Sequence, residues 1–295
     1  MKKTVFEGAA TALITPLTEN GIDYELFGKL IDWQIEKGID ALVVYGTTGE
    51  ASTLSDDEHR DAIAFASKRA AGRVPIIAGT GSNDTAYALD LTRCACEAGA
   101  DAMLVVTPYY NKATQSGLIK MFTQIADFST KPVILYNVPS RTGMTIKPET
   151  YYELSKMSNI VATKEASGDI SAIAQIAALC GDNLDIYSGN DDQVTAIMSL
   201  GGKGVISVLS NVAPKIAHDI AALYLKGECE ASRKLQLEYL DLCNDLFVDV
   251  NPIPVKEAMN MIGWNVGDVR MPLAPMSASA REKLRATLNR HGLIK

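Results

Sequence analysis

The sequence predicts an α/β fold, a (β/α)8 TIM barrel followed by a C-terminal helical extension, and three observations lead to this prediction. Short apolar runs rich in Val, Ile and Leu recur between residues 9 and 208. They do not alternate strictly with polar residues, which is typical of parallel strands covered on both faces. Helical patterns separate these runs, as in βαβ units. Residues 226–295 contain no further run of this kind.

The apolar runs predict eight strands, which is the number that closes a barrel of this type. A doubly wound sheet is the competing α/β fold, and it requires a phosphate-binding loop after an early strand. The best candidate for that loop, Gly79–Asp84, lacks the third glycine of the GxGxxG pattern, so the barrel is favoured. The predicted strands are Ala9–Ile14, Ala41–Tyr45, Pro75–Ala78, Ala102–Val106, Pro132–Tyr136, Ile160–Thr163, Leu184–Tyr187 and Gly204–Val208.

The segments between the strands carry helix signals. A capping box, Ser-Asp-Asp-Glu, begins at Ser55 and is followed by an apolar stripe with helical spacing. Asn83–Glu97 and Ile170–Cys180 show similar patterns. Each of these segments is long enough to cross from one strand to the next, so they predict the helices on the outside of the barrel.

The residues beyond the last predicted strand show helical patterns only. Leu235 begins an apolar stripe that continues at the positions four, seven and eleven residues later, which predicts one helix. Ile253–Ile262 and Ala278–Asn289 predict two more. We therefore expect a barrel over residues 1–225 and a helical extension over residues 226–295, which packs on the barrel to form a single structural unit.

Composition and charge exclude several classes of function. The chain has 28 Lys and Arg against 35 Asp and Glu, a formal net charge of −7, so it lacks the positive charge that nucleic-acid binding demands. The longest stretch free of charged residues, Ile170–Gly181, is too short to span a bilayer. No apolar signal-peptide core follows the first residues. We expect a cytoplasmic protein that binds neither nucleic acid nor membrane.

The ends of the predicted strands indicate where the chemistry would lie, because catalytic groups of such barrels sit at the carboxyl ends of the strands. Hydroxyl side chains are frequent at these positions, and one lysine, Lys164, is present. The chain has only three histidines, His59, His218 and His291, and none of them ends a strand. A histidine-rich metal site and a histidine-based hydrolase triad are therefore disfavoured, and we predict no metal site.

Lys164 is the strongest candidate for a catalytic group. The apolar strand Ile160–Thr163 would deliver its amine to the mouth of the barrel. Desolvation there favours the uncharged amine, which can attack a carbonyl carbon. The alternative is a surface lysine that pairs with the neighbouring Glu165, and position alone leaves both interpretations open.

Three further features could assist such an amine, and each has a simpler interpretation. Tyr136 ends the adjacent strand and could relay protons to a group on Lys164, or it could be a packing aromatic. Thr47–Glu50 could offer hydroxyl and N–H groups to a carboxylate, or it could be a helix capping box. Arg141 could clamp a carboxylate, or it could be a solvated loop arginine.

Four segments of the chain form a specific set of motifs: Gly46–Glu50, Pro108–Lys112, Tyr136–Thr142 and Lys164–Ser167. In spacing and order they resemble the dihydrodipicolinate synthase family, and the resemblance covers nearly the whole chain, including the helical extension. It implies the condensation of pyruvate with L-aspartate 4-semialdehyde to 4-hydroxy-tetrahydrodipicolinate in lysine and diaminopimelate biosynthesis. No cofactor is implied, because a lysine–pyruvate imine carries the chemistry.

The resemblance implies a catalytic role for four matching residues. Lys164 would form the imine with pyruvate, and Tyr136 would assist its formation. Thr47, Tyr110 and Tyr136 would relay protons. Tyr110 would enter the site of a neighbouring subunit, within a homotetramer built as a dimer of dimers.

The resemblance also implies binding roles for four residues. Thr48 and nearby backbone amides would hold the pyruvate carboxylate. Arg141 would bind the carboxylate of the semialdehyde. Gly189 and the backbone carbonyl of Ile206 would line the pyruvate pocket.

Many members of this family are inhibited by lysine at a site between subunits, and the resemblance implies a possible allosteric site here. Asp56 stands where the sensitive pattern has histidine. Tyr87 stands where it has the glutamate that would pair with the ammonium group of lysine. We therefore expect weak or absent inhibition by lysine. The positions that correspond to the site are Ala51, Ser52, Asp56, His59, Asn83, Tyr87 and Tyr109.

Two other functions remain open. A pyruvate-dependent sugar-acid lyase, such as N-acetylneuraminate lyase or a 2-keto-3-deoxy-sugar-acid aldolase, would use the same lysine chemistry. Thr47, Tyr110 and Arg141 together favour the synthase over these lyases. A non-catalytic sensor that binds a keto acid is the third possibility, and the complete set of hydroxyl groups argues against it.

Overall fold

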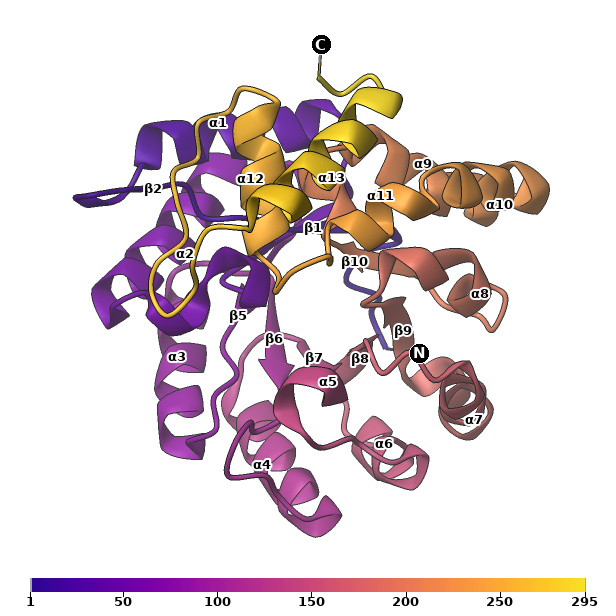
Figure 1. The fold of residues 1–295 in the computed structure, drawn as a ribbon. Coiled ribbons are helices and arrows are strands. Elements are labelled where there is room, and N and C mark those ends of the chain that lie inside the picture. The colour runs from indigo at the N-terminus through magenta and orange to yellow at the C-terminus, as the bar shows by residue number, and fades with distance from the viewer. Residues whose placement is uncertain (1, 295) are drawn as a thin grey trace.

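Within residues 2–294, which the computed structural model describes, eight parallel strands close into a barrel in the order β1-β10-β9-β8-β7-β6-β5-β4. The first strand pairs with both β10 and β4, which closes the sheet. The predicted barrel is thus confirmed, and Figure 1 shows the ring of helices around it. The strands are β1 Gly8–Ala12, β4 Ala41–Val44, β5 Ile76–Gly79, β6 Ala102–Val106, β7 Val133–Asn137, β8 Ile160–Glu165, β9 Asp185–Ser188 and β10 Gly204–Ser207.

Helices connect successive strands of the barrel. The capping box at Ser55 is present, since its hydroxyl accepts from the backbone N–H of Glu58 and the Glu58 carboxylate accepts from the N–H of Ser55. A short hairpin, β2 Leu17–Thr18 and β3 Gly21–Ile22, precedes the first helix. The helices are α1 Tyr24–Glu36, α2 Asp56–Ala70, α3 Thr85–Glu97, α4 Gln115–Phe128, α5 Pro139–Thr142, α6 Pro148–Ser155, α7 Ile170–Cys180, α8 Val194–Met198 and α9 Pro214–Leu225.

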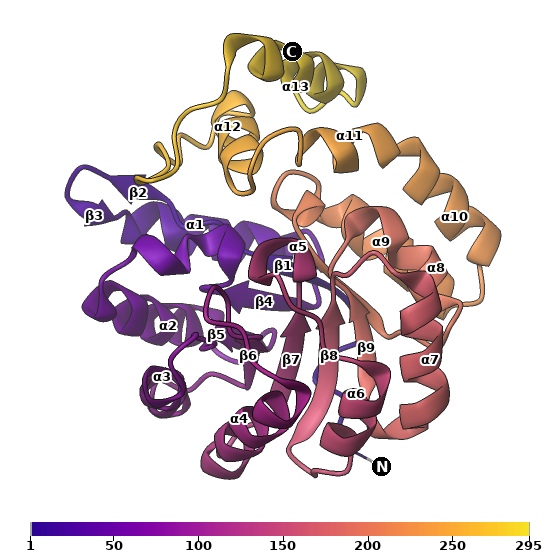
Figure 2. The same cartoon turned by 60° about the horizontal axis from the view of Figure 1, so that its bottom comes forward.

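In the part of the chain that the structure describes, four helices follow the barrel and form an arc across one end of it (Figure 2). The single helix predicted from the stripe that begins at Leu235 is wrong, because the chain leaves helical geometry at Tyr239. The break lets the first part pack on α9 and the second on the last helix, and the Tyr239 ring stacks on His291 at 4.4 Å. These helices are α10 Cys229–Glu238, α11 Leu240–Asp245, α12 Ile253–Met261 and α13 Ala278–Arg290.

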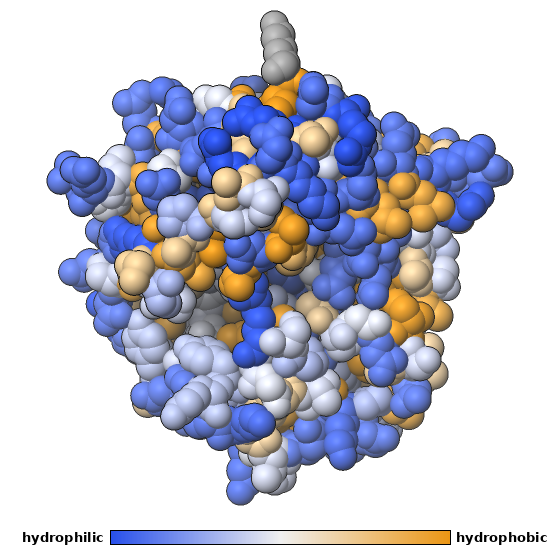
Figure 3. All heavy atoms as spheres, in the orientation of Figure 1, coloured by the Kyte–Doolittle hydropathy of each residue, from blue (hydrophilic) through white to orange (hydrophobic). Residues whose placement is uncertain are grey.

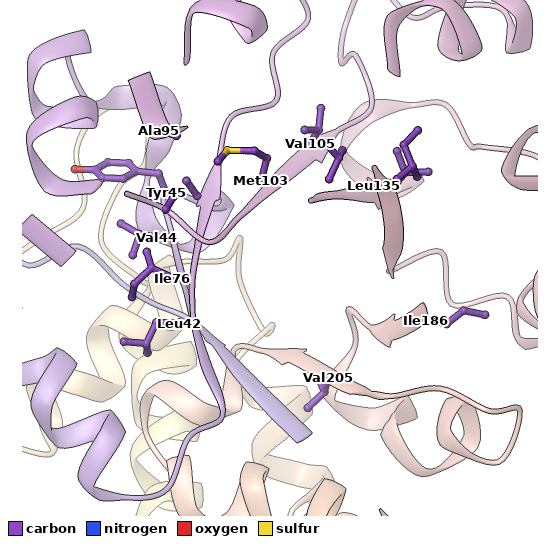
Figure 4. Close-up of a cluster of buried hydrophobic side chains, with 14 of the residues drawn as sticks. Leu42, Val44, Tyr45, Ile76, Ala95, Met103, Val105, Leu135, Ile186 and Val205 are labelled. Carbon is purple, nitrogen blue, oxygen red and sulfur yellow. The ribbon is translucent and has the colours of Figure 1, made fainter. Parts of the chain in front are cut away.

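Alternate residues of each strand face opposite sides of the sheet. In β4, Leu42 and Val44 pack outward against the helices, whereas Val43 lies in the cluster inside the barrel. Figure 4 shows part of the outer cluster, to which β4, β5, β6, β7, β9 and β10 all contribute. A third cluster joins the helical extension to the barrel. This alternation decides which residues of a strand reach the barrel interior.

The surface in the orientation of Figure 1 is mostly hydrophilic, with apolar patches between the hydrophilic residues (Figure 3). Among the described residues, no helix combines the length and the apolar character that crossing a bilayer requires.

Candidate active site

Lys164 lies inside the barrel near the carboxyl end of β8. Ala162, two residues earlier, packs in the inner cluster, and the period of two places Lys164 on the same side of the sheet. The residue is 6% exposed, and its ammonium forms no ion pair with any described residue. The amine lies 4.5 Å from the centre of the Tyr136 ring. An amine so placed can receive a small molecule from the barrel mouth.

Glu165 faces the opposite side of the sheet, between the barrel and α6. Its carboxylate accepts hydrogen bonds from Asn137 at 2.5 Å, Tyr151 at 3.0 Å and the hydroxyl of Ser167 at 2.6 Å. Burial raises the pKa of the Tyr151 phenol, so that group remains a donor to the carboxylate. The interpretation of Lys164 as a surface lysine paired with Glu165 is therefore wrong.

Tyr136 is the register partner of Lys164 on the neighbouring strand β7. It is 7% exposed and lies in the inner cluster, but it also lines the cavity at the barrel mouth. This cavity has a volume of about 520 Å³. Among the predicted site residues it is lined by Thr47, Thr48, Tyr136, Arg141, Lys164 and Gly189.

The loop after β4 forms one wall of the cavity. Thr47–Gly49 make a single 3₁₀ turn, and Glu50 follows with a φ of 59° in the left-handed region. The Glu50 carboxylate does not cap a helix: it accepts from Lys256 at 2.8 Å and from the backbone N–H of Arg270 at 2.9 Å. The capping-box interpretation of this loop is therefore wrong.

Arg141 reaches the cavity from α5, a short helix that ends at Gly143 with a φ of 69°. Its guanidinium donates one hydrogen bond, to the backbone carbonyl of Asn251 at 3.0 Å. The remaining N–H groups of the exposed side chain form no ion pair with a carboxylate among the described residues. The arginine is thus held at one point and open to an anion.

Gly189 lines the cavity, whereas Ile206 lies in the interior of the barrel. A Cβ at Gly189 would lie 2.7 Å from the Cβ of Ala166 and 3.2 Å from the Cγ of Lys164, so only glycine leaves Lys164 in place. Ile206 is fully buried in the inner cluster and does not line the cavity.

Asp191, which lies between these two residues in the sequence, is buried, and its carboxylate accepts hydrogen bonds from the N–H groups of Val208 and Leu209 at 2.9 Å each. Asp191 thus fixes the turn after β10.

Tyr110 lies away from the cavity of its own chain. It is 92% exposed, and its φ of 70° holds the backbone in the left-handed region. The carbonyl of Tyr109 accepts from the side chain of Asn83 at 3.2 Å, which ties this loop to the start of α3. Within a single chain, the structure does not bring Tyr110 together with Lys164.

The residues of the possible allosteric site gather near the starts of α2 and α3. The Tyr87 hydroxyl donates to the carboxylate of Asp56 at 2.6 Å, and burial together with this carboxylate raises the pKa of Tyr87 to about 12. His59 stacks on Tyr45, and its Nε2 lies 2.9 Å from the carbonyl oxygen of Gly79. Ala51 and Ser52 belong to the 3₁₀ turn after Glu50, and Asn83 and Tyr109 are linked as described above.

Sequence reasoning missed the contribution of the helical extension. Phe247, Asp249, Val250 and Asn251 line the cavity, and Asn251 contacts both Thr48 and Arg141. These residues lie some 200 positions from Thr48, a separation that no periodic pattern reports. The one local signal is the prolines at 252 and 254, which mark an irregular turn.

Comparison with known proteins identifies the family. Residues 5–291 match the model of the Dihydrodipicolinate synthetase family. A 4-hydroxy-tetrahydrodipicolinate synthase from Thermoanaerobacter sp. (strain X514) is 52% identical over 292 residues, 99% of this chain and 98% of the relative.

Solved structures agree with this match. Dihydrodipicolinate synthase from Aquifex aeolicus superposes with a TM-score of 0.96 at 44% identity, over 98% of this chain and 99% of the other. Dihydrodipicolinate synthase from Acinetobacter baumannii, complexed with pyruvate, superposes with a TM-score of 0.96 at 41% identity, over 99% of this chain and 100% of the other. With a parallel barrel, a buried lysine at a strand end and this similarity along its whole length, the chain belongs to the dihydrodipicolinate synthetase family.

Proposed function

We infer that the protein is a 4-hydroxy-tetrahydrodipicolinate synthase, a lyase that condenses pyruvate with L-aspartate 4-semialdehyde in lysine and diaminopimelate biosynthesis. The observation that carries this inference is the Lys164 amine, buried at the end of β8 beside Tyr136 and free of any carboxylate partner among the described residues. The similarity to synthases over the whole chain supports the same activity.

We propose that Lys164 attacks the carbonyl carbon of pyruvate and forms an imine. The carbonyl oxygen leaves as water, for which Tyr136 supplies a proton, since its ring lies against the amine. The methyl carbon then loses a proton, and the resulting enamine attacks the aldehyde carbon of the second substrate. The amino group of that substrate finally attacks the imine carbon, which closes the ring and releases Lys164.

The residues around the amine would divide the two substrates between them. Thr48 would hold the pyruvate carboxylate, and Gly189 would line its pocket. Ile206 does not line the cavity in this structure, so it would approach pyruvate only with its backbone carbonyl. Arg141 would bind the carboxylate of the semialdehyde, because its guanidinium is anchored on one side and open on the other. Thr47 would relay protons with Tyr136.

The oligomer that we propose is a homotetramer, a dimer of dimers in which Tyr110 enters the site of a neighbouring subunit. Tyr110 is exposed in a single chain and does not line the cavity of that chain, which supports this arrangement. We place the enzyme in the cytoplasm, and the five free cysteines, which form no disulfide, support a reducing compartment.

Borohydride trapping tests the proposed chemistry directly. Reduction in the presence of pyruvate is expected to add one reduced pyruvyl group to the intact protein, on Lys164, and Lys164→Ala is expected to take up none. An unmodified mass would reject both the synthase and a sugar-acid lyase. A coupled assay with aspartate 4-semialdehyde, run against N-acetylneuraminate, separates these two, and trapping without turnover of either would indicate a sensor.

A further inference from the structure

The Thr48 hydroxyl is held by a residue from the helical extension. Nδ2 of Asn251 donates a hydrogen bond to Oγ1 of Thr48 at 3.0 Å. Asn251 is 5% and Thr48 2% exposed, and both line the cavity that contains Lys164. The hydrogen bond therefore lies in the cavity wall, where water does not readily replace it.

This hydrogen bond decides what the Thr48 hydroxyl can offer to a ligand. A threonine hydroxyl has one O–H donor and two acceptor lone pairs. Because Asn251 acts as the donor, it occupies a lone pair and leaves the O–H hydrogen for another acceptor. A carboxylate in the cavity can only accept, so the hydroxyl is prepared to bind it.

The other polar groups of Asn251 also support a role in the site. Its Oδ1 is buried and has no hydrogen-bond partner among the described residues, an arrangement that costs stability. A leucine of similar size would avoid this cost, so stability alone does not account for the amide. Its backbone carbonyl, in addition, accepts from Arg141 at 3.0 Å.

We propose that Asn251 is a positioning residue that keeps the Thr48 hydroxyl as a hydrogen-bond donor to the pyruvate carboxylate. The inference rests on the proposed function, because it takes over the role of Thr48. It goes further by assigning the side chain of Asn251 to the binding of pyruvate alone. Arg141, the proposed ligand of the semialdehyde, is held by the backbone carbonyl of residue 251, which a substitution at this position retains.

Steady-state kinetics on purified full-length variants test this separation. Asn251→Leu removes the donor at nearly constant size and is expected to raise KM for pyruvate about tenfold, the loss of one hydrogen bond to a charged group. KM for the semialdehyde is expected to stay within about twofold. Asn260→Leu is the matched control, since the Asn260 amide donates to the carbonyl of Gly267 at 3.1 Å, outside the cavity, and should leave both KM values unchanged.

Asn251→Asp gives a readout that a purely structural role would not. The introduced carboxylate accepts the Thr48 proton and repels pyruvate, so KM for pyruvate is expected to rise more than in Asn251→Leu. Protonation of that carboxylate restores a donor, so this KM should fall as the pH is lowered, relative to the wild type.

A double-mutant cycle with Thr48→Val completes the test. If Asn251 acts through Thr48, the double variant is expected to have the same KM for pyruvate as Thr48→Val alone. Multiplicative effects, or equal increases of both KM values in Asn251→Leu, would overturn the inference. An active wild type that forms the trapped imine would keep the proposed function intact in that case, so the two failures are distinguishable.

Discussion

Nζ of Lys256 lies 2.8 Å from Oε1 of Glu50, and the two side chains are 2% and 0% exposed. The pair joins α12 of the extension to the loop that carries Thr47 and Thr48, and the Lys256 ammonium also donates to the carbonyl of Asp268. Burial lowers the pKa of Lys256, and the Glu50 carboxylate opposes this shift. The wall of the cavity thus depends on an ion pair that water does not reach.

Replacing one member of this ion pair is expected to cost more stability than replacing both. Lys256→Met leaves the Glu50 carboxylate buried without a cation, so we expect a loss of about 3–5 kcal/mol in the free energy of unfolding. Adding Glu50→Gln to Lys256→Met should recover part of that loss. Urea unfolding followed by circular dichroism measures both variants, and equal stability of the single and double variants would contradict the expectation.

Gly189→Ala is expected to lower kcat about a hundredfold, because the new methyl group presses on Ala166 and on the stem of Lys164. The rate of borohydride trapping should fall in parallel, since both depend on the position of the amine. Gly117→Ala is the control: its Cβ would meet ordinary contacts of 3.4 Å or more, and activity should be retained. A fully active Gly189→Ala variant would show that the amine tolerates displacement.

Complementation tests whether Tyr110 acts in a neighbouring subunit. Lys164→Ala and Tyr110→Phe are each expected to have little activity. In a mixed dimer, the site that keeps Lys164 receives an intact Tyr110 from the other chain, so unfolding and refolding an equimolar mixture should restore about a quarter of wild-type activity. Recovery of nothing beyond the sum of the two variants would place the function of Tyr110 within its own chain.

Lysine is expected to inhibit weakly or not at all. The Tyr87 hydroxyl is engaged by Asp56 and carries no charge at neutral pH, so it offers no anion to a ligand ammonium. Initial rates at increasing L-lysine measure the effect, and blockage of most activity at sub-millimolar lysine would refute the prediction. Tyr87→Glu should increase whatever sensitivity exists, since it supplies the missing carboxylate.

Stability is expected to fall as the pH rises above neutral because of His218. Its Nδ1 lies 2.9 Å from the Asp40 carboxylate, which raises the pKa of His218 above its usual value near 6.5. The folded state therefore binds this proton more tightly than the unfolded chain. The contribution is complete below pH 6.5 and is lost as the pH rises through the higher folded-state pKa. His218→Gln should flatten the slope of melting temperature against pH between 6 and 9.

Much of the barrel could be predicted because its strands are short apolar runs, and helical patterns in the sequence separate one run from the next. Ala102–Val106 and Ile170–Cys180 have the bounds that their sequence patterns indicate. The position of Lys164 near the carboxyl end of a strand could be predicted for the same reason, although β8 extends two residues beyond the predicted Ile160–Thr163 and includes it. The break in the helix at Tyr239 could not be predicted from the sequence. The apolar stripe continues through this residue, and it does not reveal that α10 and α11 pack against different helices.

The contacts that complete the site could not be predicted from local patterns. Asn251 reaches Thr48 across 203 positions, and Lys256 reaches Glu50 across 206. Period and propensity describe neighbours along a helix or strand, whereas these pairs arise only when the extension folds over the barrel. An isolated lysine in an amphipathic helix is usually exposed, so nothing in the sequence of α12 marks Lys256 as buried.

The order of synthesis gives the extension a further consequence. A ribosome releases β8, with Lys164, well before it releases Asn251 and Lys256. A nascent barrel therefore carries Lys164 while the Thr48 loop still lacks both of its anchors from the extension. Under the proposed roles of Lys164 and Thr48, the ability to hold a keto acid in reacting position is acquired only when the helices of the extension dock on the barrel.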